Sequence, residues 1–557
     1  MKALFTSILV VLLISSAAVR MSYPDLSSRV PVLYWVTDPA PTRGEQVNRF
    51  HRWQIKAGHS TEVVVTSLDD AEALRAEIPV TLVDDLVAVQ PGLAGLFAEE
   101  MDAGVLPVTV RLPVAEVRLD TASRDDTKQK IQAVSGVAAD IMDVFNGSSM
   151  RMFVEMGVLL DVTEQAKTMG FDLSKTYAAL EPELLVEGRQ YMFPGNVSSS
   201  FLTVNVELFR SLGLDPPPER WTFEAFERIG AAFCDEANAG LSRREVFFLN
   251  KIDWVRMHRG VGLPRFNETM TASVLNDARY AESLERGRRW MYDLNIVPTP
   301  DDIDAFSSAQ AYGGADLPMF GAGKYAMIEG GRYWLLQLRQ FDRLGELGFA
   351  EPPHGGFPNS SIGTRGAIIY KDTDYPELAT LFLAYLASAD YNNLIVEDAD
   401  ALPPNPAFTH IEAYLRPEAY PNEWGLHGPA AKIAETIAIG DEYSPFVLPT
   451  VVEREIKDFR DRFLAGMISA AMAAERTEAT LNREIRKRVE RDPTVRDEYE
   501  RRLAVQRRID ALKEADQPIP EVWVNNPFLK AYYASEGLLT AEVAEPLASS
   551  GSTGGGM

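Results

Sequence analysis

The chain has 557 residues, a formal net charge of -25 and 46% hydrophobic residues, which is typical of a soluble globular protein. Its length indicates two or more domains, because a single hydrophobic core stops growing well below this size. The acidic surface repels phosphate backbones and argues against a nucleic-acid partner. The single cysteine, Cys234, excludes intrachain disulfides and multi-cysteine metal sites.

The N-terminus has the pattern of an export signal. Lys2 precedes an apolar run at residues 3–14, and the small residues 16–18 form a cleavage pattern. We predict that residues 1–18 are a signal peptide removed after Ala18. The alternative is an uncleaved N-terminal anchor, because the apolar run can be extended toward the length of a membrane span. Both alternatives predict a periplasmic or extracytoplasmic protein.

Short strands and helices alternate through the first third of the chain. A strand at residues 30–36 is followed by a helix at 44–56 and a second strand at 63–66. Residues 69–112 alternate short helical and strand-like phrases, including those at 79–83 and 105–110, and their order stays open.

A clearer pattern of strand, helix, strand and helix begins at residue 116. These elements are expected at residues 116–119, 125–134, 140–145 and 150–156. Such a pattern favours a parallel sheet with helical crossovers, whose ligands collect beyond the carboxyl ends of the strands. Asp38 and the turn at residues 143–147 are therefore placed at a candidate site.

The second half of the chain continues in the same α/β style. A Pro-Gly break precedes a strand at residues 201–204 and a short helix at 206–212, and Thr222 can cap the amphipathic helix that follows. We expect further strands at residues 324–328, 348–351 and 366–370 and helices at 376–387 and 450–474. Beyond these, residues 475–515 are densely charged with apolar positions at helical spacing, and a Gly/Ser-rich tail ends the chain.

Common catalytic and metal motifs have little support. The Gly321-Ala322-Gly323-Lys324 phrase lacks the first glycine of a phosphate loop and has Tyr325 where Ser or Thr is needed. The six histidines show no paired ligand spacing, and no G-x-S-x-G motif occurs, so we expect no catalytic residue, metal or cofactor. A glycosidase carboxylate pair could be hidden among the many acidic residues, but nothing selects one.

Aromatic residues next to polar ones at predicted strand ends suggest a carbohydrate site. Sugar rings stack their apolar C–H faces on aromatic side chains, while Asp, Asn, Glu and Arg bind the hydroxyl groups. This mixture occurs three times, in Trp35 with Asp38, in Phe145 with Asn146, and in the run Arg332-Tyr333-Trp334. Each instance alone is more typical of a core aromatic than of a ligand contact.

Seven phrases in series resemble the family 1 extracellular solute-binding proteins of ABC importers, the maltose-binding-like class with the type 2 periplasmic-binding fold. They span roughly residues 30–474, and no single phrase is diagnostic. The phrases are LYWVTDPAPTRGEQVNRF, GVAADIMDVFNG, EMGVLLDVTE, YMFPGNVSSSFLTVNVELFRSLGLDPPPERWTFEAFERIG, PMFGAGKYAMIEGGRYW, GAIIYKDTDYPELATLFLAYLAS and ALPPNPA.

The resemblance implies two α/β lobes that are joined by hinge crossovers and close on a ligand. Lobe I would contain residues 30–193 and 355–402, and lobe II residues 195–353 and 403–474. A charged helical extension would follow at residues 475–545, with a disordered tail at 546–557. Residues 69–112 look like an insertion, and the C-terminal extension is long for the family.

The family pattern also implies which residues line the cleft. They come from the loop after the first strand, the strand end near Asp143, the first crossover, the Gly-Gly turn and a later helical region. With Trp35, the candidate ligand-binding residues are Thr37, Asp38, Asp143, Phe145, Asn146, Asn196, Ser198, Ser199, Arg332, Tyr333, Trp334 and Tyr443.

The resemblance therefore implies a monomeric, exported binding protein that captures a sugar or oligosaccharide and delivers it to an ABC permease. The crossover offers Ser and Asn where some sugar binders present a carboxylate, so the sugar type stays open. One alternative is an exported carbohydrate-active enzyme with a carboxylate pair. Another keeps the fold but makes the protein a sensor or scaffold, with the helices at residues 475–515 as a docking surface.

Overall fold

The computed structural model describes residues 29–121, 126–306, 315–341 and 344–541. The chain forms two compact units, and the boundaries between them lie at residues 35/36, 42/43 and 120/121. Unit 1 contains the described residues 29–35 and 43–120, and unit 2 contains residues 36–42 and the described residues from 121 onward. The predicted signal peptide or anchor and the predicted tail lie outside the described residues.

Unit 1 is a small α/β body around a two-stranded antiparallel sheet. Strand β2 (Ser60–Val65) pairs with β3 (Val108–Pro113), and the helices between them are α3 (Leu68–Glu77), α4 (Val80–Val89) and α5 (Ala94–Phe97). Most of the predicted insertion at residues 69–112 therefore forms the chain between two paired strands.

The phrase at residues 79–83, whose type the sequence leaves open, leads into helix α4. Leu82, Asp85 and Leu86 are buried at helical spacing. The Asp85 carboxylate accepts hydrogen bonds from His51 Nδ1 (3.0 Å) and Arg52 Nε (2.8 Å) of helix α2 (Arg43–Ala57). A run of valines and a leucine favours a strand locally, but the apolar face at a period of 3.6 residues decides the structure.

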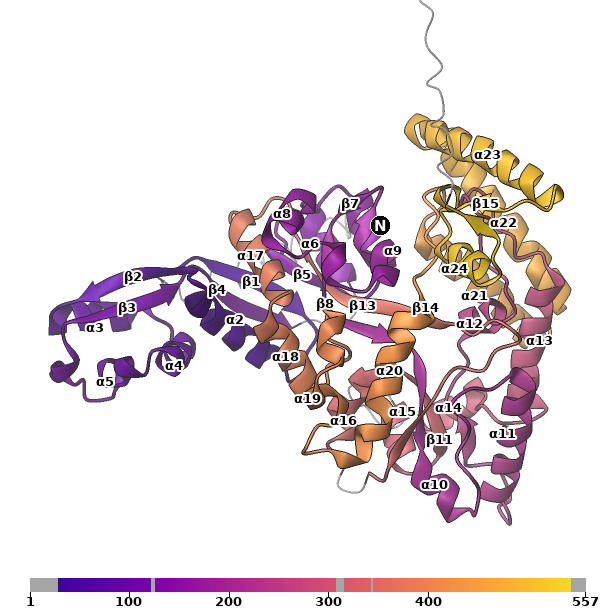
Figure 1. Cartoon of the computed structure of the whole chain (residues 1–557), viewed down its shortest axis with the longest axis horizontal. Helices are drawn as coiled ribbons and strands as arrows, with labels where there is room; N and C mark the ends of the chain where they lie inside the picture. Colours follow the sequence, from indigo (N-terminus) through magenta and orange to yellow (C-terminus); the bar gives the residue numbers. More distant parts are fainter. Residues whose placement is uncertain (1–28, 122–125, 307–314, 342–343, 542–557) are drawn as a thin grey trace, which may run out of the picture. The chain divides into compact units, whose positions relative to one another are not determined.

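The first sheet of unit 2 is built around the long strand β13 (Ser360–Ile369). It runs antiparallel to β5 (Ile141–Val144) and β8 (Met192–Ser199) and parallel to β14 (Ala438–Ile439), so the sheet is mixed. Figure 1 shows β8 and β13 side by side within this unit. Strand β1 (Val32–Thr37) stands next to β5 in the strand order, and its last two residues belong to unit 2.

The second sheet of unit 2 has the order β10-β11-β9-β12. Its strands are β10 (Phe247–Leu249), β11 (Tyr325–Gly330), β9 (Phe201–Asn205) and β12 (Leu347–Ala350). Helix α11 (Phe223–Ala237), which Thr222 caps as predicted, packs Phe226 against Phe248 and Trp290, with ring centroids 5.1 and 4.4 Å apart. The two sheets, each with its own apolar core, confirm the predicted two-lobed α/β class.

Three segments connect the two sheets. Strand β8 ends at Ser199 and β9 begins at Phe201, which forms the first crossing. The chain returns between β12 and β13, at residues 351–359, and leaves the first sheet again after β14. The residues after β14, from Gly440 onward, form the third crossing.

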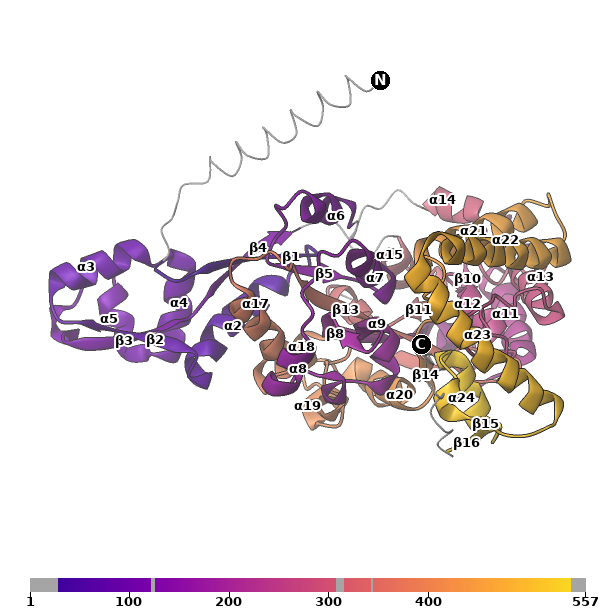
Figure 2. The ribbon, with the colours of Figure 1, turned by 90° about the horizontal axis from the view of Figure 1, so that it is seen from above.

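The C-terminal region is helical. Helix α21 (Pro449–Leu464) ends before Gly466, whose φ of 72° stops the helix, and Ser469 caps α22 (Ala470–Arg491). The single helix predicted at residues 450–474 is therefore wrong, and α22 continues through the predicted boundary at residue 474. Figure 2 shows α21 and α22 running alongside each other, followed by α23 (Pro493–Glu514) and then α24 (Pro527–Ser535).

The remaining elements complete the described chain. They are β4 (Glu116–Thr121), α6 (Thr127–Val134), α7 (Gly147–Glu155), α8 (Thr163–Met169), α9 (Glu181–Leu184), β6 (Leu185–Val186), β7 (Arg189–Gln190), α10 (Val206–Ser211), α12 (Trp254–Arg259), α13 (Ala278–Tyr292), α14 (Pro300–Phe306), α15 (Asp316–Gly321), α16 (Leu335–Leu338), α17 (Pro376–Leu386), α18 (Ala389–Asp398), α19 (Glu412–Leu415), α20 (Trp424–Thr436), β15 (Ile519–Pro520) and β16 (Leu539–Thr540). Among the described residues, no helix has both the length and the apolar character needed to cross a membrane.

Candidate functional site

The strand ends of the first sheet meet at the side chain of Arg365. Its Nη1 donates to Asp143 Oδ2 at 2.6 Å, and Thr37 Oγ1 donates to the same oxygen at 2.5 Å. Arg365 Nη2 donates to the Tyr391 hydroxyl at 2.9 Å, and that hydroxyl donates to the Gly195 carbonyl at 2.7 Å. The structure thus joins the ends of β1 and β5 to the first crossing, as the strand-end rule predicts.

Asn196, on β8 before the first crossing, extends this network. Its Nδ2 donates to Asp400 Oδ1 at 2.9 Å, and its carbonyl accepts from Thr364 Oγ1 at 2.6 Å. The second oxygen of Asp400 lies 3.6 Å from Arg365 Nη2.

Burial alone lowers the pKa of a guanidinium, but the neighbouring groups of Arg365 more than offset it. The Tyr391 hydroxyl and the carboxylates of Asp143 and Asp400 raise the pKa of Arg365 well above its ordinary value. The cation is therefore permanently charged and compensated inside the protein.

Several of the predicted ligand residues are therefore buried beneath the protein surface. Thr37, Asp38, Asp143 and Asn196 are each at most 7% exposed. Trp35, on β1 in unit 1, is completely buried. We infer that the polar members of this set support the loops that follow them, because their polar atoms already bind protein groups.

The residues directly after these strand ends are more accessible. Phe145 is half-buried and Asn146 is exposed at the start of helix α7, where Asn146 Oδ1 caps the helix by accepting from Ser149 N at 2.8 Å. On the crossing, Ser198 is half-buried, while Ser199 is buried and its hydroxyl donates to the Ala430 carbonyl at 3.3 Å. Phe145, Asn146 and Ser198 are thus predicted site residues whose side chains are at least partly exposed to solvent.

The turn after β11 carries the corresponding residues of the second lobe. Gly331 sits so close to Ser198 that a Cβ at this position would collide with the Ser198 hydroxyl and the Tyr333 ring. Tyr333 is half-buried, whereas Trp334 is 8% exposed and belongs to an apolar core cluster. The glycine therefore brings Ser198 of the crossing and Tyr333 of the second lobe together.

Arg332, which lies between Gly331 and Tyr333, is buried and bound by other groups of the protein. It is 1% exposed and donates to the main-chain carbonyls of Val396 and Ala401 at 3.0 and 2.8 Å. Its guanidinium also lies 4.6 Å from the centre of the Tyr414 ring. Burial lowers the pKa of Arg332 to about 10, so the side chain stays charged at neutral pH.

A polar cluster at the ends of β10 and β11 was not predicted. Asn250 Nδ2 donates to Asp316 Oδ2 at 2.7 Å, and Asn250 Oδ1 accepts from the Glu329 amide at 2.8 Å. The Glu329 carboxylate also pairs with Lys251 Nζ (3.2 Å) and Arg256 Nη2 (2.9 Å). Lys251 keeps 45% of its side chain exposed and is a candidate second-lobe contact. The same strand-end rule finds Asn250 and Lys251 once the short strand β10 is recognised.

Tyr443, on the third crossing, lies beside the start of helix α7. A Cβ on Gly147 would collide with the Tyr443 ring, and the guanidinium of Arg151, one turn along α7, lies 4.9 Å from the ring centre. The Tyr443 hydroxyl donates to Glu183 Oε1 at 3.0 Å. The structure thus places Tyr443 next to the turn that presents Phe145 and Asn146.

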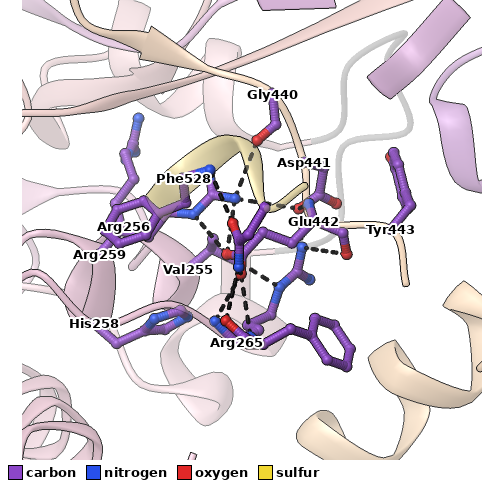
Figure 3. Close-up of polar contacts among 12 residues, drawn as sticks. Val255, Arg256, His258, Arg259, Arg265, Gly440, Asp441, Glu442, Tyr443 and Phe528 are labelled. Atoms are coloured by element: carbon purple, nitrogen blue, oxygen red, sulfur yellow. Dashed lines mark hydrogen bonds and ion pairs between the residues drawn. The ribbon is translucent and has the colours of Figure 1, made fainter. Parts of the chain in front are cut away.

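Two buried arginines fix the third crossing to the second lobe (Figure 3). Arg259 Nη2 donates to Glu442 Oε1 at 3.1 Å, and the Arg265 amide donates to Glu442 Oε2 at 2.9 Å. The Arg265 guanidinium pairs with Asp441. Burial alone would raise the pKa of Glu442, but Arg259 and Arg265 hold it below its ordinary value.

The same carboxylate binds the C-terminal extension. Asn526 Nδ2, just before α24, donates to Glu442 Oε2 at 2.9 Å. The Phe528 ring centre lies 5.4 Å from the Arg259 guanidinium. In Figure 3, Tyr443 lies at the edge of the cluster and points away from the arginines. The crossing is therefore anchored at Asp441 and Glu442, directly before Tyr443, whose hydroxyl binds Glu183 of the first lobe.

Comparison with protein families gives one match. The model of the family described as bacterial extracellular solute-binding protein matches residues 115–393, which is half of the chain. None of the curated proteins that were compared matches the chain.

Solved structures with the same fold extend over most of the chain. The ABC substrate-binding protein Lmo0181 from Listeria monocytogenes, in complex with cycloalternan, has 18% sequence identity and a TM-score of 0.59, over 82% of this chain and 98% of that one. An ABC transporter solute-binding protein from Thermotoga lettingae, bound with α-D-tagatose, has 15% identity and a TM-score of 0.58, over 82% and 100%. The GacH receptor of Streptomyces glaucescens, whose structures include a complex with acarbose, has 15% identity and a TM-score of 0.57, over 82% and 99%. At these identities the likeness establishes the fold.

Proposed function

This chain belongs to the family of bacterial extracellular solute-binding proteins, and from that membership we propose that it is the exported substrate-binding component of an ABC import system. In this proposal the protein captures a sugar or oligosaccharide between its two lobes and delivers it to a membrane permease, as a monomer. The ligands named for the three similar structures, which are cycloalternan, α-D-tagatose and acarbose, support a carbohydrate.

The observation that carries the proposal is the set of accessible side chains at the strand ends of both lobes. Phe145, Asn146 and Ser198 come from the first lobe and its crossing, and Lys251 and Tyr333 from the second. Aromatic rings stack on sugar faces, and amide, hydroxyl and ammonium groups bind sugar hydroxyls. The charges beneath this set are paired inside the protein, which suits an uncharged ligand.

Closure in this proposal follows from differential affinity. A ligand that touches residues of both lobes stabilises the closed arrangement, while a ligand that touches only one lobe stabilises neither arrangement over the other. The proposed mechanism contains no covalent step and requires no cofactor or metal.

The direct test is a thermal-shift screen followed by calorimetry with maltotriose, acarbose, tagatose and mannitol. We expect at least one of them to raise the melting temperature, because ligand that binds only the native state stabilises it. Tyr333→Ala should weaken that ligand about tenfold or more, as removal of a central aromatic contact does. Tyr292→Ala, which removes an exposed tyrosine of α13 in the same lobe, is the matched control.

Two results would count against the proposal. Release of shorter sugars during the incubation would instead support the carbohydrate-active enzyme. Equal affinity of the Tyr333→Ala variant and the parent protein would remove Tyr333 from the ligand site.

A further inference from the structure

One buried carboxylate connects the two sides of the proposed ligand site. Glu183, on helix α9, is 2% exposed. Its Oε2 accepts a hydrogen bond from the Gly147 amide, the first residue of α7, and its Oε1 accepts from the Tyr443 hydroxyl at 3.0 Å. The same side chain thus holds the turn that presents Asn146 and the aromatic residue of the third crossing.

We propose that Glu183 is a positioning residue whose charge sets how firmly Asn146 and Tyr443 are held, so that ligand affinity depends on pH near neutrality. This inference rests on the proposed function for its affinity effect. It does not assign Glu183 a contact with ligand, because both of its oxygens bind protein groups.

The groups around Glu183 explain why its proton is exchanged in this range. Burial, and to a smaller extent the nearby carboxylate of Asp441, raise the pKa of Glu183 to about 7. The Gly147 amide, the Tyr443 hydroxyl and the Arg151 guanidinium act in the opposite direction.

Two elements packed around Glu183 contribute to this balance. Arg151 and the Gly147 amide come from α7, and Asp441 and Tyr443 come from the crossing. Two further charges act through these groups. Glu187, on the turn after β6, interacts with Arg151, and Arg265 pairs with Asp441.

Solvent can reach this group of residues. A groove of about 1070 Å³ is lined by Arg151, Asp441 and Tyr443, together with parts of α9 and the C-terminal extension. The groove therefore brings solvent to the residues next to Glu183.

The direction of the affinity effect follows from hydrogen-bond strength. A carboxylate accepts from both Gly147 and Tyr443, and hydrogen bonds to a charged acceptor are about twice as strong as neutral ones. The neutral acid has one hydroxyl oxygen that donates, so it holds one of the two partners less well. We therefore expect ligand affinity to increase as the pH rises through about 7, by roughly fivefold.

The test compares Glu183→Gln with the parent protein between pH 5.5 and 8.5. Glutamine keeps an acceptor and a donor of the same shape but cannot ionise. Calorimetric titration with the carbohydrate that gave the largest thermal shift should show tighter binding at high pH in the parent and a flat profile in Glu183→Gln. Glu181→Gln, which removes an exposed carboxylate from the same helix, should keep the parent profile.

A second readout needs no ligand. Hydrogen–deuterium exchange of the peptide that contains the Gly147 amide, corrected for intrinsic exchange rates, should show greater protection at pH 8.5 than at pH 5.5 in the parent protein. Glu183→Gln should remove this difference. If no carbohydrate binds but the protection changes as expected, the proposed function fails while the positioning role stands. Equal pH profiles of exchange in the parent and in Glu183→Gln would overturn the inference.

Discussion

The buried clusters around Arg365 and around Glu442 are built from the same groups, yet they hold different parts of the molecule together. In the first, one guanidinium binds two carboxylates from the first lobe, Asp143 and Asp400, and thereby fixes the first crossing. In the second, one carboxylate collects Arg259, the Arg265 amide and Asn526, and thereby fixes the third crossing to the second lobe and to the extension. The first crossing is thus anchored to the first lobe, and the third crossing is anchored to the second lobe.

This difference predicts how much stability the protein loses when one partner is removed from each cluster. Arg365 would keep one carboxylate partner if the other were removed. The Glu442 carboxylate accepts hydrogen bonds from four residues, which are Arg259, Arg265, Phe266 and Asn526, so its loss leaves several buried groups without their acceptor. We therefore expect substitution of Glu442 to destabilise the protein more than substitution of one carboxylate next to Arg365.

The largest effect is expected for Glu442→Ala. Removing one partner of a buried ion pair costs about 3–5 kcal/mol because the opposite charge stays buried. Equilibrium unfolding in urea should show this loss in the free energy of unfolding. Glu442→Gln, which keeps the shape of the side chain and one acceptor oxygen but not the charge, should lose less. A change below about 1 kcal/mol for Glu442→Ala would mean that the third crossing is not anchored by this carboxylate.

A smaller loss, of about 2–3 kcal/mol, is expected for Asp143→Ala. Asp143 accepts from Thr37 and Arg365, but Asp400, 3.6 Å from Arg365, still compensates the cation. The double variant with Asp400→Ala should therefore lose more than the sum of the single losses, which a double-mutant cycle measures. Additive losses would show that the two carboxylates do not share the charge of Arg365.

The histidine next to the Glu442 cluster predicts an acid-sensitive step. Burial lowers the pKa of His258 to about 4, and its Nδ1 lies 2.8 Å from the Leu263 carbonyl. The pKa of His258 in the folded protein is below its unfolded value of about 6.5. Neutral His258 therefore contributes stability that is fully present above pH 6.5 and is lost as the pH falls toward 4. Between pH 7.5 and 5 the loss should be about 2 kcal/mol.

Urea unfolding of the parent and of His258→Asn across this pH range checks the expectation. Asparagine keeps a donor for the Leu263 carbonyl but does not titrate, so the variant should lose less stability on acidification. Parallel pH profiles for the two proteins would contradict the pKa assigned to His258. His59→Gln, which alters an exposed histidine of unit 1, is the control.

The sequence predicted the two-lobed α/β architecture and proposed candidate site residues for identifiable reasons. Strand ends follow from local patterns, which suggest Asn146, whereas Ser198 and Tyr443 are candidates that the family resemblance implies. Arg332 and Trp334 were named by the same pattern, but their burial depends on Tyr414, Val396 and an apolar cluster distant in the sequence.

What the sequence missed has equally local causes. Strand β10 is only three residues long, which is too short for its period to be recognised, so Lys251 was overlooked. The break between α21 and α22 depends on a single glycine conformation and one capping serine within an otherwise helical pattern. The Arg365 and Glu442 clusters join residues more than 170 positions apart, which no spacing rule detects.

The smallest effect is expected at the exposed contact between the extension and the first lobe. Arg488 of α22 pairs with Glu155 of α7, with side chains that are 24% and 46% exposed. Such pairs contribute about 0–1 kcal/mol, because solvent screens the charges and two long side chains lose freedom. Arg488→Gln should therefore change the free energy of unfolding by less than about 1 kcal/mol. Arg486→Gln, at an exposed position on the same helix, is the matched control.

This pair still differs from the buried clusters in what it connects. The Glu442 cluster joins the extension to the second lobe, whereas Arg488 joins the extension to the first lobe. If the extension moves with the second lobe, opening of the lobes must break the Arg488–Glu155 contact. Arg488→Gln should then leave stability nearly unchanged but increase the radius of gyration of the ligand-free protein in small-angle X-ray scattering. An unchanged radius together with a stability loss above about 2 kcal/mol would place the role of Arg488 in folding and not in closure.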